Sequence, residues 1–559
     1  MALRRPAFVL AVAAVLLLVP SLMLGTLISH GSPQNLSWAA QFADQFRAGV
    51  LYPRWLPDSF DKLGGPIFYF YPPIGFWIDA LLSAATFNVL SVSYRLSLSS
   101  LLLLWVSGLA MHAWLKAEAR SPRVALYGAL AYMAAPYHLV DHYWRGAYAE
   151  FAAYAVLPLV ALAVRHVAER RRFGLIFLAA AYAALPMAHL PTALLISLTA
   201  LPMYVLYRGW RLGAARPALG FFIRCALGGA LGLGLAAIYL IPALILQDWI
   251  SAEELWLAEH YRIERWFVLT LALRHQLVDL MVVVAWAALA YGIAAIGVLT
   301  VLAQAGVRQG WRSEAAFWAF VCLLCLLLIA GVVPWFWQIP FAAKVQFPWR
   351  LMIVVEFAVI TALCLAARYG RSRVASFIFI AAFIALIAGV YEMERGIRLN
   401  INASLVDIDT PKDAKEYLPA GFTQKPGAGI SDLGLEPLED TPTISCTPAT
   451  RVCRADEERF GELRIEVEGN APTTVVLRRF FFPAWRLDGP MVIVPTDKYR
   501  LISFSVLAGH STVRLQRVTL PAEQWGLAIS SVSLVMLLAA AAFNARNGRP
   551  VVTTRPPAN

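Results

Sequence analysis

The feature that most constrains this chain is a series of apolar runs separated by short polar and basic stretches. Runs of about 20 residues match the length at which a helix crosses the hydrocarbon core of a bilayer. With 60% hydrophobic residues, the chain is too apolar for an ordinary soluble protein. We therefore expect an α-helical polytopic membrane protein. The runs predict about twelve transmembrane helices, at residues 8–28, 96–115, 124–136, 148–164, 174–188, 192–207, 218–246, 277–302, 315–333, 351–367, 375–390 and 525–543.

Charge fixes the expected orientation. The formal net charge is +12, but the basic residues are clustered between the apolar runs, which is typical of membrane topology and argues against nucleic-acid binding. If residues 74–90 do not cross the membrane, the basic clusters all fall on one side, together with the N-terminus. We therefore interpret 74–90 as an interfacial helix within a long outer loop, residues 29–95. The first run is kept as a helix rather than a cleaved signal peptide, because no convincing cleavage site follows it.

A polar stretch near the C-terminus reads as a domain of its own. We divide the chain into a transmembrane domain (1–390), an outer β-rich domain (391–524), and a final helix with a basic cytoplasmic tail (525–559). Alternating or β-branched segments predict strands at 462–468, 473–482, 491–495, 500–507 and 511–518, which a small sandwich or barrel would pair. Cys446 and Cys453 lie in this domain and are a candidate disulfide if the compartment is oxidising.

The first outer loop is dense in proline, glycine and aromatic residues, at 51–57 and 64–73. Proline and glycine favour tight turns, and aromatic rings favour the headgroup layer. We expect a rigid platform, with Arg54, Trp55 and Tyr71 shaping a binding cleft.

Ionisable residues near membrane depth are costly and therefore indicate function. Residues 137–146 hold Asp141 and Arg145, and Glu150 follows one turn later. Both carboxylates and the arginine are candidates for a site, although a simple Asp141–Arg145 pair is the alternative. His138 and His142 have helical metal-ligand spacing, but no third ligand is evident.

Two further segments carry candidates. His189 lies between prolines that free backbone groups, which favours either a satisfied core residue or a wet site. Arg350 stands at the mouth of a run, with Lys344 just before it, and an arginine fork suits phosphate. The alternative is an internal pair between Arg350 and Glu356.

Six short motifs together resemble one bacterial membrane family. They lie at residues 51–55, 70–73, 135–146, 189–192, 346–350 and 482–486. The family's members are labelled 6-pyruvoyl-tetrahydropterin synthase-related, and the chain is similar to YfhO-like and dolichyl-phosphate-mannose-protein mannosyltransferase-like proteins of the GT-C glycosyltransferase superfamily. The resemblance covers most of the chain.

The resemblance implies a GT-C architecture and transfer of a sugar from a polyprenyl-phosphate donor to an acceptor outside the cytoplasm, in cell-envelope glycan assembly. It also implies a bacterial inner (plasma) membrane location, with a cytoplasmic N-terminus and a periplasmic or extracellular C-terminal domain. GT-C enzymes usually carry an acid just after the first span, whereas residues 30–35 here are HGSPQN. Under this resemblance, either Asp44, Asp58, Asp61 or Asp141 takes the role of base, or the protein has lost transfer chemistry.

We expect Asp141 or Asp44 to act as base, with Arg145 and Arg350 on the donor phosphate. No cofactor is required by the motifs, and a divalent metal is left open. The sugar, the acceptor and the oligomeric state are not indicated. The alternative is a non-enzymatic carrier of lipid-linked glycans or a membrane assembly factor.

Overall fold

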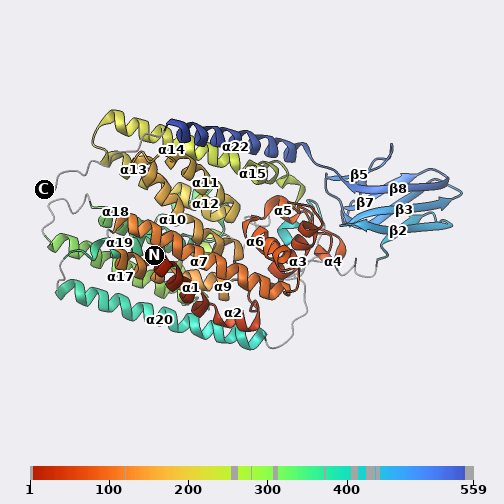
Figure 1. Ribbon diagram of the computed structural model, residues 1–559. Coiled ribbons are helices and arrows are strands. Elements are labelled where there is room, and N and C mark those ends of the chain that lie inside the picture. Colours follow the sequence, from red (N-terminus) through yellow and green to blue (C-terminus); the bar gives the residue numbers. More distant parts are fainter. Residues whose placement is uncertain are drawn as a thin grey trace.

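In the computed structural model, the chain forms a long helical bundle with β-strands at one end and the C-terminal end of its last described helix, α22 (Pro521–Asn547), toward the other (Figure 1). We call these the β end and the opposite end. The structure describes residues 4–119, 121–252, 262–277, 280–305, 313–369, 373–404, 413–422, 435, 438 and 441–547.

The bundle is built from helices that follow the apolar runs. They are α1 (Arg4–Leu17), α2 (Val19–Leu24), α7 (Val92–Glu118), α8 (Pro122–Met133), α10 (Tyr148–Ala168), α11 (Gly174–Ala188), α12 (Leu190–Leu198), α13 (Ala200–Arg211), α14 (Ala215–Leu235), α15 (Ala237–Ile245), α17 (Leu280–Gln304), α18 (Glu314–Ala330), α19 (Met352–Ala366), α20 (Arg373–Ser404) and α22 (Pro521–Asn547). Short elements connect them: α9 (Pro136–Tyr143), α16 (Val268–Leu273), and the 3₁₀ turns η1 (Gln247–Trp249), η4 (Ile263–Trp266), η6 (Pro334–Gln338), η7 (Ala343–Val345), η8 (Pro348–Leu351) and η9 (Lys415–Tyr417).

The described helices support a multi-pass membrane protein, and they do not confirm the expected number of twelve spans. Eight are long and apolar enough to cross a membrane, and four further apolar helices are shorter. The expected run at 8–28 is interrupted at Leu18, where α1 ends and a proline-containing α2 begins. The expected run at 124–136 is a helix of 12 residues, α8. Proline and glycine residues interrupt these apolar runs, so an apolar run can be longer than the helix that forms within it.

The first loop, residues 25–91, folds into α3 (Ser32–Arg47), α4 (Ser59–Lys62), α5 (Ile67–Phe70) and α6 (Ile74–Ala85). The 12 residues of α6 extend roughly 18 Å, less than a bilayer core, which fits the interfacial helix expected there. Aromatic rings meet edge to face inside the loop: Phe68 lies 4.7 Å from Phe42 and 4.8 Å from Phe76. These contacts make the loop a packed unit at the β end (Figure 1).

The β-domain is a sandwich of two antiparallel four-stranded sheets, ordered β1-β4-β7-β6 and β2-β3-β8-β5. Its strands are β1 (Ile444–Thr447), β2 (Val452–Arg459), β3 (Glu462–Gly469), β4 (Thr473–Phe480), β5 (Trp485–Leu487), β6 (Val494–Pro495), β7 (Leu501–Val506) and β8 (Gly509–Arg517). The five expected strands are present as β3, β4, β6, β7 and β8. The expectation missed β1, β2 and β5, of which β1 and β5 are short and β2 is rich in charge.

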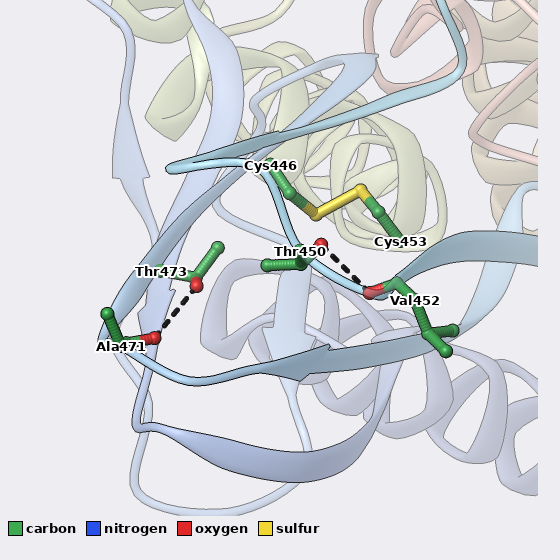
Figure 2. The surroundings of a disulfide bond; sticks show 6 residues. All are labelled: Cys446, Thr450, Val452, Cys453, Ala471 and Thr473. Carbon is green, nitrogen blue, oxygen red and sulfur yellow. Dashed lines mark hydrogen bonds between the residues drawn. A yellow bond between two sulfur atoms is a disulfide. The ribbon is translucent and has the colours of Figure 1, made fainter.

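Cys446 and Cys453 form a disulfide that joins β1 to β2, with 6.2 Å between their Cα atoms (Figure 2). Because these strands belong to different sheets, the bond ties the two layers of the sandwich together.

Buried side chains hold the β-domain against the first loop and α22. The ring of Trp55 lies 5.2 Å from that of Trp485. Arg54 Nε lies 3.0 Å from Glu523 Oε1 in the first turn of α22, and its Nη2 donates to Ile238 O at 2.7 Å. We call this contact the Arg54 clamp, because it connects the first loop to α15 and α22.

The predicted basic clusters meet at the opposite end, as far as they are described. Arg208 lies 3.4 Å from Glu314, and Arg165 contacts Glu118. Arg172 Nε donates to Asn544 O at 2.7 Å, near the end of α22. Other basic residues between the apolar runs, at 120, 308, 312, 371, 549 and 555, lie outside the described residues. The β-domain lies at one end of the bundle, and Arg165, Arg172 and Arg208 lie at the other.

Candidate functional site

The candidate site lies at the β end, where α9 meets the first turn of α10. Pro136 occupies the first turn of α9, a position that needs no backbone donor. Gly146 then reverses the chain with a φ of +58°, which favours glycine. A Cβ at Gly146 would lie 2.9 Å from the backbone nitrogen of Ser32. Glycine therefore allows this turn to approach the residues that follow the first helices.

Hydrogen bonds join that turn to residues 30–35. They run from His30 N to Trp144 O at 3.3 Å, from Gly31 N to Arg145 O at 2.9 Å, and from Asn35 Nδ2 to Gly146 O at 2.7 Å. The resemblance places an acid in this segment, and the sequence has none. The structure brings the turn that follows Asp141 against the same segment.

Arg145 is the centre of the site. Its Nη1 donates to Asp141 Oδ1 at 2.6 Å and to Glu150 Oε2 at 2.7 Å. The same nitrogen lies 2.8 Å from the hydroxyl of Tyr137, which in turn donates to Glu150 Oε1 at 2.7 Å. Asp141 is 0% exposed and Glu150 is 1% exposed. One guanidinium group thus pairs with two buried carboxyl groups.

The surroundings of Asp141 favour its neutral form. Burial raises the pKa of Asp141 well above its usual range, and the neighbouring Glu150 raises it further, while Arg145 opposes both. Asp141 Oδ2 is buried and has no hydrogen-bond partner within the described residues. The site therefore contains a carboxyl group that is poised to hold a proton.

Arg350 enters the same site from η8, at the start of the span formed with α19. Its Nε lies 3.4 Å from Glu150 Oε2. Its Nη1 donates to Val345 O at 2.7 Å and to Gln346 Oε1 at 3.3 Å, and its guanidinium carbon lies 5.1 Å from the centre of the Phe347 ring. Arg145 and Arg350 therefore share Glu150, which brings two buried cations together.

Glu356 is not the partner of Arg350. Its Oε1 accepts from Tyr137 N at 2.9 Å and from the Tyr291 hydroxyl at 3.2 Å, and its Oε2 accepts from the Tyr154 hydroxyl at 2.8 Å. The alternative of an internal Arg350–Glu356 pair is thus not observed. Three donors satisfy this carboxylate inside the bundle and anchor α9 to α19.

His189 and Tyr71 lie at the margin of the site. His189 separates α11 from α12, and its Nδ1 is 2.7 Å from Thr192 Oγ1. Burial lowers the pKa of His189 to about 3, although the Glu150 carboxylate opposes that effect. Burial raises the pKa of Tyr71 to about 12, while Arg350 and Arg145 oppose the shift. Both residues are therefore uncharged near neutral pH.

The two histidines of α9 serve different neighbours. His138 Nδ1 lies 3.1 Å from Tyr132 O, and its ring stacks on Tyr154 at 3.8 Å. His142 Nε2 lies 2.8 Å from Ser21 Oγ. In the part of the chain that the structure describes, no three His, Cys, Asp or Glu side chains form a metal-binding group. The donor set around Asp141 thus offers no recognisable metal cage.

Four other predicted residues lie away from this cluster or at its edge. Asp44 pairs with Arg47 at 2.5 Å and is 58% exposed. It lies nine residues beyond Asn35 in α3, roughly 13 Å along the helix axis. Arg54 and Trp55 hold the β-domain and α22, as described above, and Lys344 is an exposed residue of η7 beside Val345.

The remaining alternative bases, Asp58 and Asp61, face the β-domain. Burial raises the pKa of Asp58, and the nearby Glu457 adds to the shift. Asp61 pairs with Arg478 of β4. Of the four candidate bases, Asp141 is thus the one that contacts Arg145 in the buried cluster.

Sequence reasoning missed Tyr137 and Tyr154 as polar partners of the site. Tyr137 stands within the 137–146 motif, which is a usable signal. Tyr154 lies in an apolar helix, where only the packing of α10 against α19 shows its role.

Comparisons with known proteins leave the family open. No family model and no curated protein matches the chain. Among solved structures, the arabinofuranosyltransferase AftD from Mycobacteria is similar at 15% identity and a TM-score of 0.42. The similarity covers 70% of this chain and 27% of that chain. At this TM-score the likeness carries no argument about fold or activity. The pterin synthase-related family is not shown and stays a prediction.

Proposed function

We propose that the chain is an integral membrane glycosyltransferase of the GT-C type, which transfers a sugar from a polyprenyl-phosphate donor to an acceptor at the β end. The observation that carries the proposal is the convergence of Asp141, Glu150, Arg145 and Arg350 in one dry cluster at the ends of the helices. The proposal includes a bacterial inner-membrane location, with the β end outside the cytoplasm and a role in cell-envelope glycan assembly.

The residues have distinct roles in the proposed reaction. The departing phosphate carries negative charge, which the guanidinium groups of Arg145 and Arg350 neutralise more effectively in a dry site than in water. Asp141, in its ionised form, removes the proton from the acceptor hydroxyl, and its raised pKa makes it a stronger base. Glu150 holds the two arginines close together in the absence of phosphate.

The proposal is tested with protein purified in native lipid. We expect mass spectrometry to identify a bound polyprenyl phosphate, and a lipid-linked sugar to be consumed. Asp141→Asn should lower transfer by roughly 10²–10⁴-fold with lipid still bound, as for loss of a general base. Arg350→Ala should weaken lipid binding by about tenfold or more, because a hydrogen bond to a charged group contributes about 1.5–3 kcal/mol.

Asp44→Asn is the matched control, since Asp44 is an exposed acid of the same type outside the cluster. It should change neither transfer nor lipid binding. Transfer that survives Asp141→Asn unchanged would refute the proposed base. A wild-type protein that binds the lipid but never consumes it would favour the alternative, a carrier of lipid-linked glycans or an assembly factor.

A further inference from the structure

A small cavity with a mainly apolar wall and a few polar groups lies beside the cluster, on the side of α7 and the first loop. Its wall includes Asp141 and His142 of α9, Ser100 of α7, and Ser32 and Asn35 of α3. The cavity has room for about one water molecule, and its wall offers the polar partners that a buried water needs.

Asp141 connects the cavity to the ionic cluster. Its Oδ1 is taken by Arg145, whereas its Oδ2 is buried and lacks a hydrogen-bond partner within the described residues. A buried carboxylate oxygen without a hydrogen bond costs free energy. Asp141 also belongs to the wall of the cavity, so a water molecule there would offset that cost.

We propose that water in this cavity hydrogen-bonds to Asp141 Oδ2 and exchanges the proton of the Asp141 carboxyl group with solvent at the β end. The cavity is then the route by which Asp141 is restored as a base. The catalytic meaning of this route rests on the proposed function, but the exchange itself does not.

The proton balance is simple. In the transfer step, the acceptor hydroxyl loses its proton to the Asp141 carboxylate, and its oxygen forms the new bond to the anomeric carbon of the sugar. The bond from that carbon to the phosphate oxygen breaks, and polyprenyl phosphate leaves with the bonding electron pair. The O–H bond of the Asp141 carboxyl group then breaks, the proton passes to cavity water, and bulk water receives it. The carboxylate is regenerated, and no oxidant, reductant or other reactant is needed.

The charged and titratable groups around Asp141 come from several elements. Arg145 follows on the chain, Glu150 faces it from α10, and Glu356 faces it from α19. His142 and Tyr148 belong to the cavity wall. Burial lowers the pKa of His142 to about 4, so this imidazole is neutral and does not repel a proton in the cavity.

The test measures proton exchange rather than transfer activity. The full-length protein in lipid is measured by infrared spectroscopy. The C=O band of a protonated carboxyl group is assigned to Asp141 if the band is absent from Asp141→Asn. On transfer to heavy water, we expect this band to shift rapidly in the wild type. Ser100→Val fills the cavity and should slow the shift by an order of magnitude or more, whereas Ser100→Ala should leave it fast.

Ser107→Val is the matched control, because Ser107 is a buried serine of α7 two turns further along the same face. Ser107→Val should exchange the Asp141 proton as fast as the wild type does. This result would show that α7 tolerates a valine in place of a buried serine. Equal exchange in Ser100→Val and the wild type would overturn the proposal, as would a wild-type band that does not exchange in the folded protein. Fast exchange without any sugar transfer would refute the proposed function and leave the proton route intact.

Discussion

The two ends of the bundle carry arginine–carboxylate clusters of the same residue types in different surroundings. At the opposite end, Arg208 lies 3.4 Å from Glu314 and 3.9 Å from Glu118. At the β end, Arg145 lies 2.6 Å from Asp141 and 2.7 Å from Glu150. The Arg208 and Glu314 side chains are 17% and 18% exposed, whereas those of Asp141 and Glu150 are 0% and 1% exposed.

The two clusters differ in how far their side chains are exposed to water. Arginine pairs that reach water at a helix end fasten α7, α13 and α18 and fit the positive side of a membrane protein. Among the described residues, buried carboxylate oxygens without a hydrogen bond occur at both ends: Asp141 Oδ2 at the β end, and Glu118 Oε1 and Glu314 Oε1 at the opposite end. The β-end cluster differs in that its two carboxylates are 0% and 1% exposed. Such an arrangement costs stability, which favours a functional reason for keeping it.

The largest expected effect comes from removing the shared cation at the β end. Arg145→Ala leaves two buried carboxylates without their partner and should lower the free energy of unfolding by about 3–5 kcal/mol. The equivalent change at the opposite end, Arg208→Ala, should cost about 1 kcal/mol, because water replaces the lost contacts. Denaturant-induced unfolding in lipid compares the two variants directly.

Arg145→Lys controls for charge, since it keeps the cation but loses the planar fork. Its loss of stability should fall between those of the wild type and Arg145→Ala. Equal losses for Arg145→Ala and Arg208→Ala would remove the distinction between the two ends.

An intermediate effect is expected from a second buried pair at the β end, between Asp79 of α6 and Arg95 of α7, 3.4 Å apart. Burial raises the pKa of Asp79 from 3.8 to about 6, and Arg95 only partly opposes this. A raised pKa means that the folded state gains stability from the neutral carboxyl group at low pH and loses it as the pH rises from about 4 to about 6.

Asp79→Asn mimics the neutral carboxyl and should lack this pH dependence. The difference in unfolding free energy between wild type and variant should change by up to about 3 kcal/mol across that window and be flat above it. The measurement is denaturant unfolding at a series of pH values. A wild type that parallels the variant throughout would show that Asp79 stays well solvated or well paired.

The smallest expected effect concerns the disulfide of the β-domain. Replacing both Cys446 and Cys453 with serine opens a loop of sequence separation 7 and should lower the stability of the β-domain by about 2 kcal/mol in the chain-entropy estimate. The described free cysteines are Cys225, Cys322, Cys325 and Cys364, and all belong to the bundle helices.

Labelling the cysteine thiols of the wild type in cells, before and after reduction, tests whether the β end and the opposite end lie in different compartments. Labels that reach Cys446 and Cys453 only after reduction would place the β end in an oxidising compartment. Free thiols at both positions without reduction would contradict that placement.

Much of the fold could be predicted because its signals are local. Apolar runs located the helices, and alternating or β-branched segments located the strands β3, β4, β7 and β8. Buried residues recur every three to four positions in a helix and every second position in a strand, so both patterns can be seen in the sequence. The lengths of the helices are harder to predict. The break at Leu18 depends on backbone geometry within an apolar run, whereas the break at His189 falls between the expected runs 174–188 and 192–207.

The candidate site divides in the same way. The Asp141–Arg145 pair, which the sequence offered as the alternative to a functional site, is present in the structure, and Glu150 joins it. By contrast, the sequence offered Glu356 as the neighbour of Arg350, while packing pairs Arg350 with Glu150. Arg54 likewise finds Glu523, which lies hundreds of residues later in the chain.

The sequence by itself determined a multi-pass helical protein with a β-rich C-terminal segment, and it determined which residue types stand at the helix ends. Tertiary structure alone decided which of those charges meet, which are buried, and that Asp141 contacts Arg145 and also belongs to the wall of a small cavity. The physical reason is range: helical and strand periodicities act over a few residues, whereas pairing between helices depends on how whole segments pack.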